Sequence, residues 1–416
     1  MAGGLTRRET LGALAAGIAA VAAPAGALPL TYHPGEGRGP ASDRSVLDPG
    51  LRRGGTNDPI QPKSLQAIAA TKNMRFGSCF KWGRPGQDSG SFANPRYAAL
   101  LDHDCGLLVP ENELKWQALR PTPDSFNFAP FDAMLAWSEK HGFAMRGHNL
   151  LWNQPKWMPA WERNYDFGPT PSKAAAAMLV DHIRTVCTRY GTRIGAYDVV
   201  NETVVPEDGS LHETNLSRAI GGTIQTVDLA FRTAREAAPH AQLVYNDYMS
   251  WEAGNEHHRA GVLRLLEGLR KRGTPVDALG VQSHIRTSGP DIAATVAQQE
   301  PAWRRFLDEV TGMGYALVVT ELDVHDDGLP ADFAARDRAV ADYTRAYLDI
   351  MLDYPQLRDV LAWGLTDRYS WLQTSQPRAD GIPRRCCPYD AEFRMKPMRA
   401  AIGEALAAAS PRARQG

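Results

Sequence analysis

The sequence predicts an α/β fold in which eight parallel strands alternate with helices and close into a (β/α)8 barrel, the TIM barrel. Eight short apolar runs, spaced widely enough for one helix and its loops in each interval, carry this prediction. Each run is almost continuously apolar, as expected for parallel strands covered on both faces. No Gly-rich phosphate loop follows an early run, which disfavours an open doubly wound sheet.

The first 27 residues have the features of an export signal. Arg7 and Arg8 precede an apolar, Ala-rich run, and residues 25–27 offer a small-residue cleavage site. The run is too short to span a membrane permanently. The paired arginines resemble a twin-arginine signal, although Thr10 stands where that signal usually has Phe, which leaves a general secretory route open. We expect an exported protein, periplasmic or secreted, with no membrane attachment after signal removal.

Residues 28–62 are dense in Pro and Gly and poor in large apolar side chains, so we expect a flexible linker there. Residues 410–416 predict a flexible tail for the same reason. Residues 63–409 between them form a single catalytic domain in this interpretation. The formal net charge of the chain is -1, so it lacks the excess of positive charge expected of a nucleic-acid-binding protein. We expect the domain to act as a monomer.

The strands and the clearest helices follow from the spacing of apolar residues. We expect strands over Arg75–Phe80, Leu107–Pro110, Ala144–Gly147, Ala196–Val200, Leu243–Tyr245, Ala278–Gln282, Ala316–Thr320 and Val360–Leu365. Helical periodicity is clearest over Ser172–Tyr190, Ile224–Ala238, Glu256–Arg272 and Arg336–Leu352.

The chain has five cysteines, and none of them shows the spacing of a metal site. Cys386 and Cys387 are adjacent, and we expect two reduced thiols there rather than a strained bridge. We therefore expect no metal site, and a fold whose stability comes from its core.

Polar residues follow almost every predicted strand at its C-terminal end, where the active site of a (β/α)8 barrel lies. They are carboxylates, amides, imidazoles and indoles, and only the first strand lacks them. Chance would not place buried polar groups on one side of seven strands. The sequence therefore predicts a catalytic cleft at this rim.

Two of these residues suit the cleavage of a glycosidic bond. Glu202 follows the fourth strand and Glu321 the seventh. Such cleavage needs one carboxylic acid to protonate the leaving oxygen, and a carboxylate that attacks the anomeric carbon or activates water. A separation of about 5 Å favours direct attack and retention of configuration, and a wider one favours inversion.

The neighbours of the two glutamates suggest different roles. Asp323 and His284 predict a chain of hydrogen bonds that keeps Glu321 ionised, as a nucleophile requires. Asn201 precedes Glu202, and its amide suits a hydrogen bond to the sugar 2-hydroxyl. Glu202 would then be the acid/base, protonated in the first step and ionised in the second.

The ordered strand-end motifs resemble glycoside hydrolase family 10, the endo-β-1,4-xylanases. Asp198-Val199-Val200-Asn201-Glu202 is similar to that family's acid/base strand, and Thr320-Glu321-Leu322-Asp323 to its nucleophile strand. Five further strand ends match in order, over roughly residues 64–405. The resemblance implies a retaining enzyme that acts on xylan and xylo-oligosaccharides without a metal or organic cofactor. It implies subsite residues on the non-reducing side of the cut at Glu111, Asn112, Lys115, His148, Trp152, Gln282, Trp363 and Trp371, with Tyr248 as a stacking platform on the reducing side.

Three other functions remain open at this point. A β-1,4-glucanase or cellobiohydrolase on the same scaffold is the nearest rival, because xylose and glucose differ only at the C5 substituent. A non-catalytic carbohydrate-binding barrel is disfavoured, since both glutamates are present. A barrel enzyme acting on phosphorylated metabolites would need a Gly-rich phosphate cup after the seventh or eighth strand, and the sequence has none.

Overall fold

The computed structural model of the protein describes residues 62–414, which belong to one compact unit. The expected signal segment, and all but the last residue of the expected linker, lie outside these residues. Within residues 62–414, no helix combines the length and the apolar character needed to cross a membrane.

Eight parallel strands form a closed barrel, as the sequence predicts. Neighbours in sequence pair in parallel from β1 to β6, β6 pairs with β8, and β9 pairs with both β8 and β1, which closes the ring. A ninth strand, β7 (His284–Arg286), is short and pairs only with the far end of β8. The barrel strands are β1 (Arg75–Phe80), β2 (Leu107–Pro110), β3 (Ala144–Trp152), β4 (Ala196–Asn201), β5 (Gln242–Asp247), β6 (Ala278–Val281), β8 (Ala316–His325) and β9 (Leu357–Ala362).

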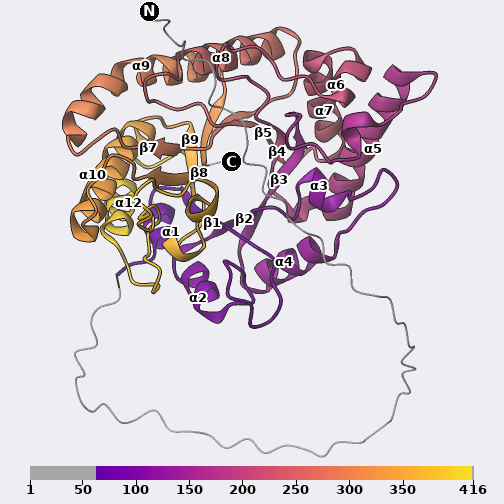
Figure 1. The fold of residues 1–416 in the computed structure, drawn as a ribbon. Coiled ribbons are helices and arrows are strands. Elements are labelled where there is room, and N and C mark those ends of the chain that lie inside the picture. Colours follow the sequence, from indigo (N-terminus) through magenta and orange to yellow (C-terminus); the bar gives the residue numbers. More distant parts are fainter. Residues whose placement is uncertain (1–61, 415–416) are drawn as a thin grey trace, which may run out of the picture. The chain divides into compact units, whose positions relative to one another are not determined.

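Helices surround the strands in sequence order, so that consecutive parts of the chain follow one another around the barrel (Figure 1). The short helix α1 precedes the barrel and packs on the last helix, α12. The helices are α1 (Leu65–Ala70), α2 (Pro95–Asp104), α3 (Trp116–Leu119), α4 (Ala129–Lys140), α5 (Pro171–Tyr190), α6 (Asn215–Ile220), α7 (Thr223–Ala237), α8 (Glu256–Lys271), α9 (Ile292–Gly312), α10 (Phe333–Leu352), α11 (Leu372–Ser375) and α12 (Pro397–Ala408). Three 3-10 turns cover Glu162–Asn164, Gly191–Arg193 and Asp367–Tyr369.

Local sequence signals set where several helices begin. Asp291 and Asp332 cap α9 and α10, because each carboxylate accepts a hydrogen bond from a backbone N–H in the first turn. Thr214 and Ser217 form a reciprocal capping box at the start of α6. Proline stands in the first turn of α2, α4, α5 and α12, where its missing N–H has no helical acceptor to lose.

The core has two layers, as expected for a sheet that is covered on both faces. A small cluster joins side chains from opposite strands, including Val109 of β2 and Ala278 of β6, and fills the inside of the barrel. A much larger cluster lies between the strands and the outer helices. The ends of the strands are thereby held firmly, which is the condition for positioning catalytic side chains.

Residues 410–414 differ from the flexible tail that the composition of residues 410–416 predicts. The Arg412 side chain is only 3% exposed, and its guanidinium donates to the carbonyls of Leu352, Leu357 and Ser410. Its backbone N–H bonds to the carbonyl of Lys72. Composition misses this because one buried arginine that satisfies four carbonyls orders a segment that has no apolar anchor of its own.

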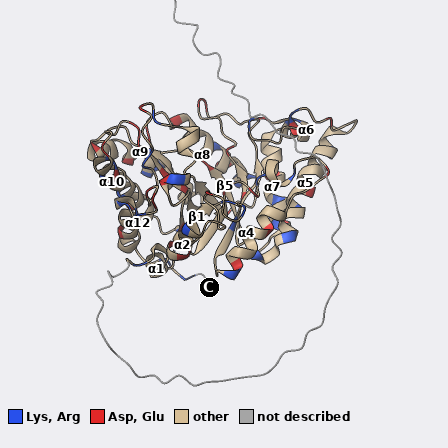
Figure 2. Ribbon diagram, turned by 60° about the horizontal axis from the view of Figure 1, so that its bottom comes forward, with Lys and Arg blue, Asp and Glu red and all other residues tan. Residues whose placement is uncertain are grey.

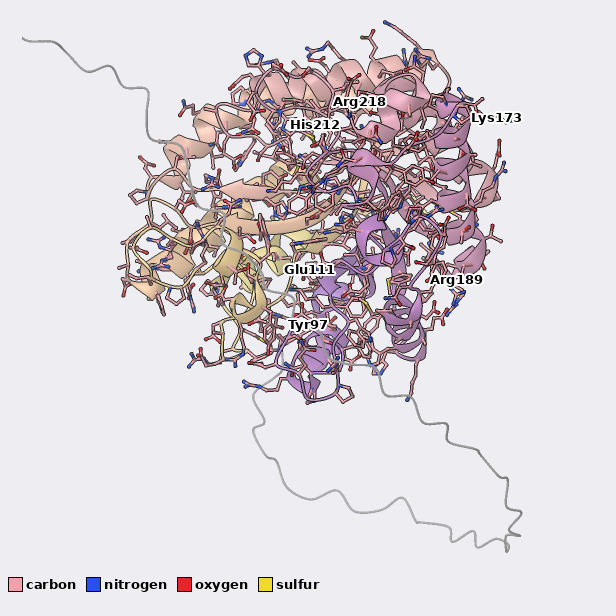
Figure 3. All side chains as sticks on the ribbon, turned by 45° about the vertical axis from the view of Figure 1, so that its right-hand side comes forward. Tyr97, Glu111, Lys173, Arg189, His212 and Arg218 are labelled. Carbon is pink, nitrogen blue, oxygen red and sulfur yellow. The ribbon has the colours of Figure 1, made fainter. Side chains whose placement is uncertain are left out.

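Basic and acidic residues alternate over the outer helices, in line with the near-zero net charge (Figure 2). Ion pairs between neighbouring helices are part of this pattern, for example Arg189 of α5 with Asp132 of α4 at 2.5 Å. Lys173 and Arg189 mark the outer helix α5, whereas Glu111 lies near the middle of the molecule (Figure 3).

Candidate active site

A cleft of about 860 Å³ lies where the barrel strands end. All the catalytic and sugar-binding residues predicted from the sequence line it: Glu111, Asn112, Lys115, His148, Trp152, Asn201, Glu202, Tyr248, Gln282, His284, Glu321, Trp363 and Trp371. The remaining predicted residue, Asp323, lies behind the cleft wall and is fully buried. The sequence prediction that strand ends converge at one rim is therefore confirmed.

Glu202 is the first residue after β4, in a left-handed backbone conformation with φ of 49°. Its two carboxylate oxygens each accept one hydrogen bond at 2.9 Å, from Gln282 Nε2 and from Trp152 Nε1. Burial, together with the negative charges of Asp247 and Glu321, outweighs these hydrogen bonds and raises its pKa to about 7. Glu202 can therefore hold a proton in neutral or mildly acidic solution.

Glu321 lies within β8 and is only 4% exposed. Its Oε1 accepts a hydrogen bond from Asn246 Nδ2 at 2.8 Å, and its Oε2 is 3.3 Å from His284 Nε2. Burial alone would raise its pKa, but the hydrogen bond with His284 and the charges of the nearby His148, His284 and Lys115 lower it below the ordinary value. Glu321 is therefore ionised where Glu202 is protonated.

The predicted chain from Asp323 through His284 to Glu321 is present. His284 Nδ1 is 2.8 Å from Asp323 Oδ1, and Trp371 Nε1 donates to the other Asp323 oxygen at 2.7 Å. Burial opposes the charged imidazolium, but Asp323 and Glu321 outweigh it and raise the pKa of His284 to about 10. Both ring nitrogens then carry protons, which fixes the ring between two carboxylates.

Asn246 was not among the predicted site residues, yet it joins the two halves of the site. Its Nδ2 donates to Asn201 Oδ1 at 2.9 Å as well as to Glu321, and its Oδ1 accepts from Thr320 Oγ1 at 2.7 Å. The amide Nδ2 of Asn201 has no partner within residues 62–414 and is buried at the cleft. Its predicted hydrogen bond to a sugar hydroxyl stays a prediction.

Aromatic and basic side chains form one wall of the cleft. Lys115 Nζ is 4.7 Å from the Trp152 ring centre and 5.9 Å from that of Trp363, so its ammonium group sits between two indoles. The rings of Trp152 and Trp157 stack at 4.7 Å between centroids. An indole wall of this kind suits the C–H face of a sugar ring.

Sequence reasoning missed several residues that line the cleft. Trp157 could have been found from its position five residues after Trp152. Glu252, Arg286 and His325 had no such signal, because they follow predicted strands at irregular distances. The further lining residues are Gln117, Gln154, Lys156, Trp157, Ser250, Glu252, Ala253, Asn255, Arg286, His325, Ser375 and Gln376.

Within residues 62–414, the only group of side chains spaced for a metal ion is Asp367, Cys386 and Cys387, which does not line the cleft. Lys396 Nζ already bonds to both oxygens of Asp367, at 3.1 and 2.9 Å. The two sulfurs are 3.7 Å apart, and both thiols are free, as predicted. This group is an ion pair beside two buried thiols.

The relatives of the chain are glycosidases by name. Endo-1,4-beta-xylanase 5 of Pyricularia oryzae is 30% identical over 333 residues, which cover 78% of this chain and 75% of that protein. Endo-1,4-beta-xylanase B of Thermotoga neapolitana is 28% identical over 317 residues, 75% of this chain and 84% of that protein.

Solved structures agree in fold. Native xylanase 10B from Thermotoga maritima has a TM-score of 0.71 and 28% identity, and the match covers 82% of this chain and 98% of that one. Xylanase 10B from Thermotoga petrophila RKU-1, solved in complex with xylobiose, has a TM-score of 0.72 and 27% identity, with coverage of 83% and 98%. The family model for glycosyl hydrolase family 10 matches residues 64–405. With its closed barrel, the two glutamates that share its cleft and this match, the chain belongs to glycosyl hydrolase family 10.

Proposed function

We propose that the protein is an endo-1,4-β-xylanase that cuts internal bonds of xylan with retention of configuration. One observation carries the proposal: Glu202 and Glu321 share a cleft, and their surroundings hold the first protonated and the second ionised. That asymmetry is what a double displacement requires. Membership of family 10, relatives named as endo-xylanases and the xylobiose complex of one structural neighbour support xylan as the substrate.

In the first step a Glu321 oxygen attacks the anomeric carbon of the sugar in the cleft. The bond from that carbon to the leaving sugar breaks, and the leaving oxygen takes its electron pair and the proton of Glu202. In the second step Glu202, now a carboxylate, removes a proton from water. The water oxygen attacks the same carbon and releases Glu321.

The other predicted residues bind and orient the sugar. Asn201 Nδ2, which has no partner within residues 62–414, would donate to the 2-hydroxyl of the reacting sugar, a contact that strengthens in the transition state. Glu111, Asn112, Lys115, His148, Trp363 and Trp371 would bind units on the non-reducing side, and Tyr248 a unit on the reducing side. Trp152 and Gln282 would also orient the Glu202 carboxyl that they hydrogen-bond.

Product analysis on glucuronoxylan tests this proposal. Wild type should release short xylo-oligosaccharides, and Glu321→Ala should release none. Proton NMR of the first product formed from xylotetraose should show the β-anomer before mutarotation. A first product with the α-anomer would exclude retention, and faster hydrolysis of a soluble cellulose derivative than of xylan would favour the glucanase.

We also propose that the enzyme works outside the cytoplasm as a monomer, and leaves by the twin-arginine route. The paired Arg7 and Arg8 before an Ala-rich apolar run support export. A polymeric substrate must be cut outside the cell, which also supports export. Light scattering coupled to size-exclusion chromatography tests the monomer, because a dimeric mass would contradict it.

A further inference from the structure

The cleft has two ends, and the predicted subsite residues account mainly for one of them. Glu111, Asn112 and Lys115 follow β2, whereas Tyr248 and Glu252 follow β5 and Arg286 ends β7. In the strand order of the barrel, β5 and β6 lie across the ring from β1 and β2. The end of the cleft above β5 and β7 is therefore a separate binding region.

His325 of β8 pairs with Arg286 of β7, which places it beside this end, and it has no role in the mechanism described above. It is the last residue of β8, four positions after Glu321, so both side chains lie on the same face of the strand. It lines the cleft but is only 3% exposed, and its ring meets that of Trp371 edge-on at 6.1 Å. Its Nδ1 is buried and has no hydrogen-bond partner within residues 62–414.

The missing partner of Nδ1 indicates which ring nitrogen carries the proton. A buried N–H without an acceptor is rarer and more costly than a buried lone pair, so the neutral ring keeps its proton on Nε2. Burial and the charges of Arg286 and Arg384 outweigh Asp323 and lower the pKa of His325 to about 4. The ring is therefore neutral near pH 6, with the Nε2–H as its donor toward the cleft.

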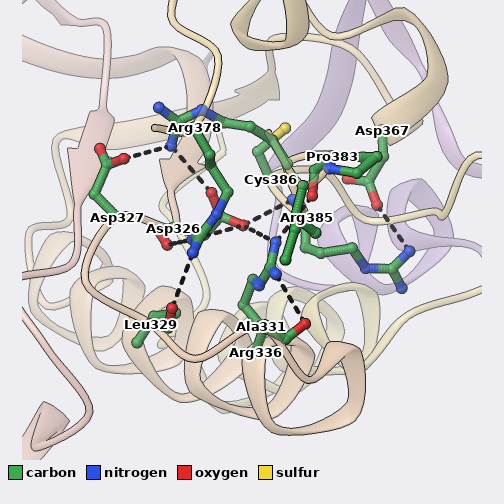
Figure 4. A network of polar contacts seen from close by, with 12 residues as sticks. Asp326, Asp327, Leu329, Ala331, Arg336, Asp367, Arg378, Pro383, Arg385 and Cys386 are labelled. Carbon is green, nitrogen blue, oxygen red and sulfur yellow. Dashed lines mark hydrogen bonds and ion pairs between the residues drawn. The ribbon is translucent and has the colours of Figure 1, made fainter. Parts of the chain in front are cut away.

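The backbone around His325 is anchored on both sides, which fixes the ring. Thr287 N donates to the His325 carbonyl at 3.0 Å. The next residue, Asp326, is fully buried and accepts a hydrogen bond at 3.0 Å from Arg336 Nη1 (Figure 4). Arg384 Nη1 donates to its other oxygen, also at 3.0 Å. A side chain on such a support is pre-organised for a ligand.

The other wall of this region is also fixed. Glu252 Oε1 accepts hydrogen bonds from the Arg286 backbone N–H at 2.7 Å and from Tyr343 Oη at 3.3 Å. The Arg286 side chain reaches Gln376 Oε1 at 3.1 Å and pairs with Asp327. Polar atoms from three strand ends thus surround one stretch of the cleft.

We propose that His325, together with Glu252 and Arg286, forms a subsite for a sugar unit on the reducing side of the cut, in which His325 Nε2–H donates a hydrogen bond to a sugar hydroxyl. The side follows from Glu202, which protonates the leaving oxygen at the end of β4, beside β5. The leaving sugar therefore extends toward β5 and β7. The subsite rests on the proposed function, because it takes the leaving part of the same substrate.

Two substrates distinguish a loss of binding at this subsite from a defect in the chemical step. Xylopentaose places sugar units on both sides of the cut, whereas the aromatic leaving group of 4-nitrophenyl β-xylobioside has no hydroxyl. The variant His325→Phe keeps a ring against Trp371 and removes both nitrogens. Its kcat/KM on xylopentaose should fall about three- to tenfold, the effect of one neutral hydrogen bond, and stay within about twofold of wild type on the aryl substrate.

His325→Gln restores a donor and should recover most of the loss on xylopentaose. His257→Phe makes the same exchange at an exposed histidine of α8 outside the cleft, and should leave both rates unchanged. An equal loss on both substrates by His325→Phe, or no loss on either, would overturn the subsite. If wild type itself fails to cut xylopentaose, the proposed function fails, and the subsite with it.

Discussion

The chemistry of the site depends on how individual residues set the charges of two glutamates. Glu321 is buried and Glu202 partly buried, and desolvation alone raises the pKa of both. His284 breaks the symmetry, because its imidazolium contacts Glu321 and is itself stabilised by Asp323. Glu202 receives only the neutral donors Gln282 and Trp152. His284, together with the charges of His148 and Lys115, therefore decides which carboxylate is the acid.

The pH profile follows from these shifts. The rate should fall as pH rises through about 7, because Glu202 loses the proton that it must donate. It should fall again on the acid side only below the ordinary pKa of a glutamate, because the pKa of Glu321 is lowered. We expect kcat/KM on xylo-oligosaccharides to give this bell-shaped curve.

The variant Glu202→Ala checks the assignment of the alkaline limb. Loss of the acid should lower kcat on xylan by about 100- to 10,000-fold. With 2,4-dinitrophenyl β-xylobioside, whose leaving group needs no proton, formation of the glycosyl-enzyme should stay fast and show no decline near pH 7. An alkaline limb that persists in this pre-steady-state step would assign it to another group.

At the scale of strands, the sequence predicts where elements begin better than where they end. The starts of β1, β2, β3, β4, β6 and β8 agree with the apolar runs. The apolar runs predict ends for β3 and β8 that come too early, because both strands continue through polar residues as far as Trp152 and His325. Those polar residues line the active site. They interrupt the apolar run, so the strand end predicted from that run comes too early.

The partners of the predicted residues could not be predicted in the same way. Asn246 binds residues from β4 and β8, and its contacts depend on the register between β4, β5 and β6. A single sequence contains strand-end motifs but not their registers. The sequence therefore predicts the carboxylates and the indoles of the site, but not the role of the Asn246 amide that connects the two halves.

A glycine in β6 makes room for that amide. A Cβ at Gly280 would lie 2.4 Å from Asn246 Oδ1 and 3.0 Å from Val244 Cγ1, both in the closely packed interior. Gly280→Ala should therefore displace Asn246 from Glu321 and Asn201, and we expect kcat on xylan to fall by about tenfold or more, as for the loss of one site hydrogen bond to a charged group.

The matched control is Gly268→Ala in α8, where a new Cβ meets no atom within 4 Å. It should keep full activity and raise stability slightly, because alanine favours a helix over glycine by about 1 kcal/mol. Circular dichroism would check that both variants are folded. A Gly280→Ala enzyme with the kcat of wild type would contradict the role given to Asn246.

At the scale of the whole molecule, the fold is completed without covalent links. All five cysteines are buried and free. Stability comes from the two-layered core and from buried ion pairs such as Arg146 with Asp198, and Arg399 with Asp104. Such a fold can form in the reducing cytoplasm before export, and the twin-arginine route matches this order of events.

Replacement of Arg7 and Arg8 by lysine tests this route. If the arginine pair is the export signal, the xylanase activity of the double variant should stay in the cytoplasmic fraction. The activity of wild type should appear in the periplasm or the medium. Because Lys keeps the positive charge of the segment, a general secretory route would still accept the variant. Normal export of the double variant would therefore show that Thr10 marks a departure from the twin-arginine signal.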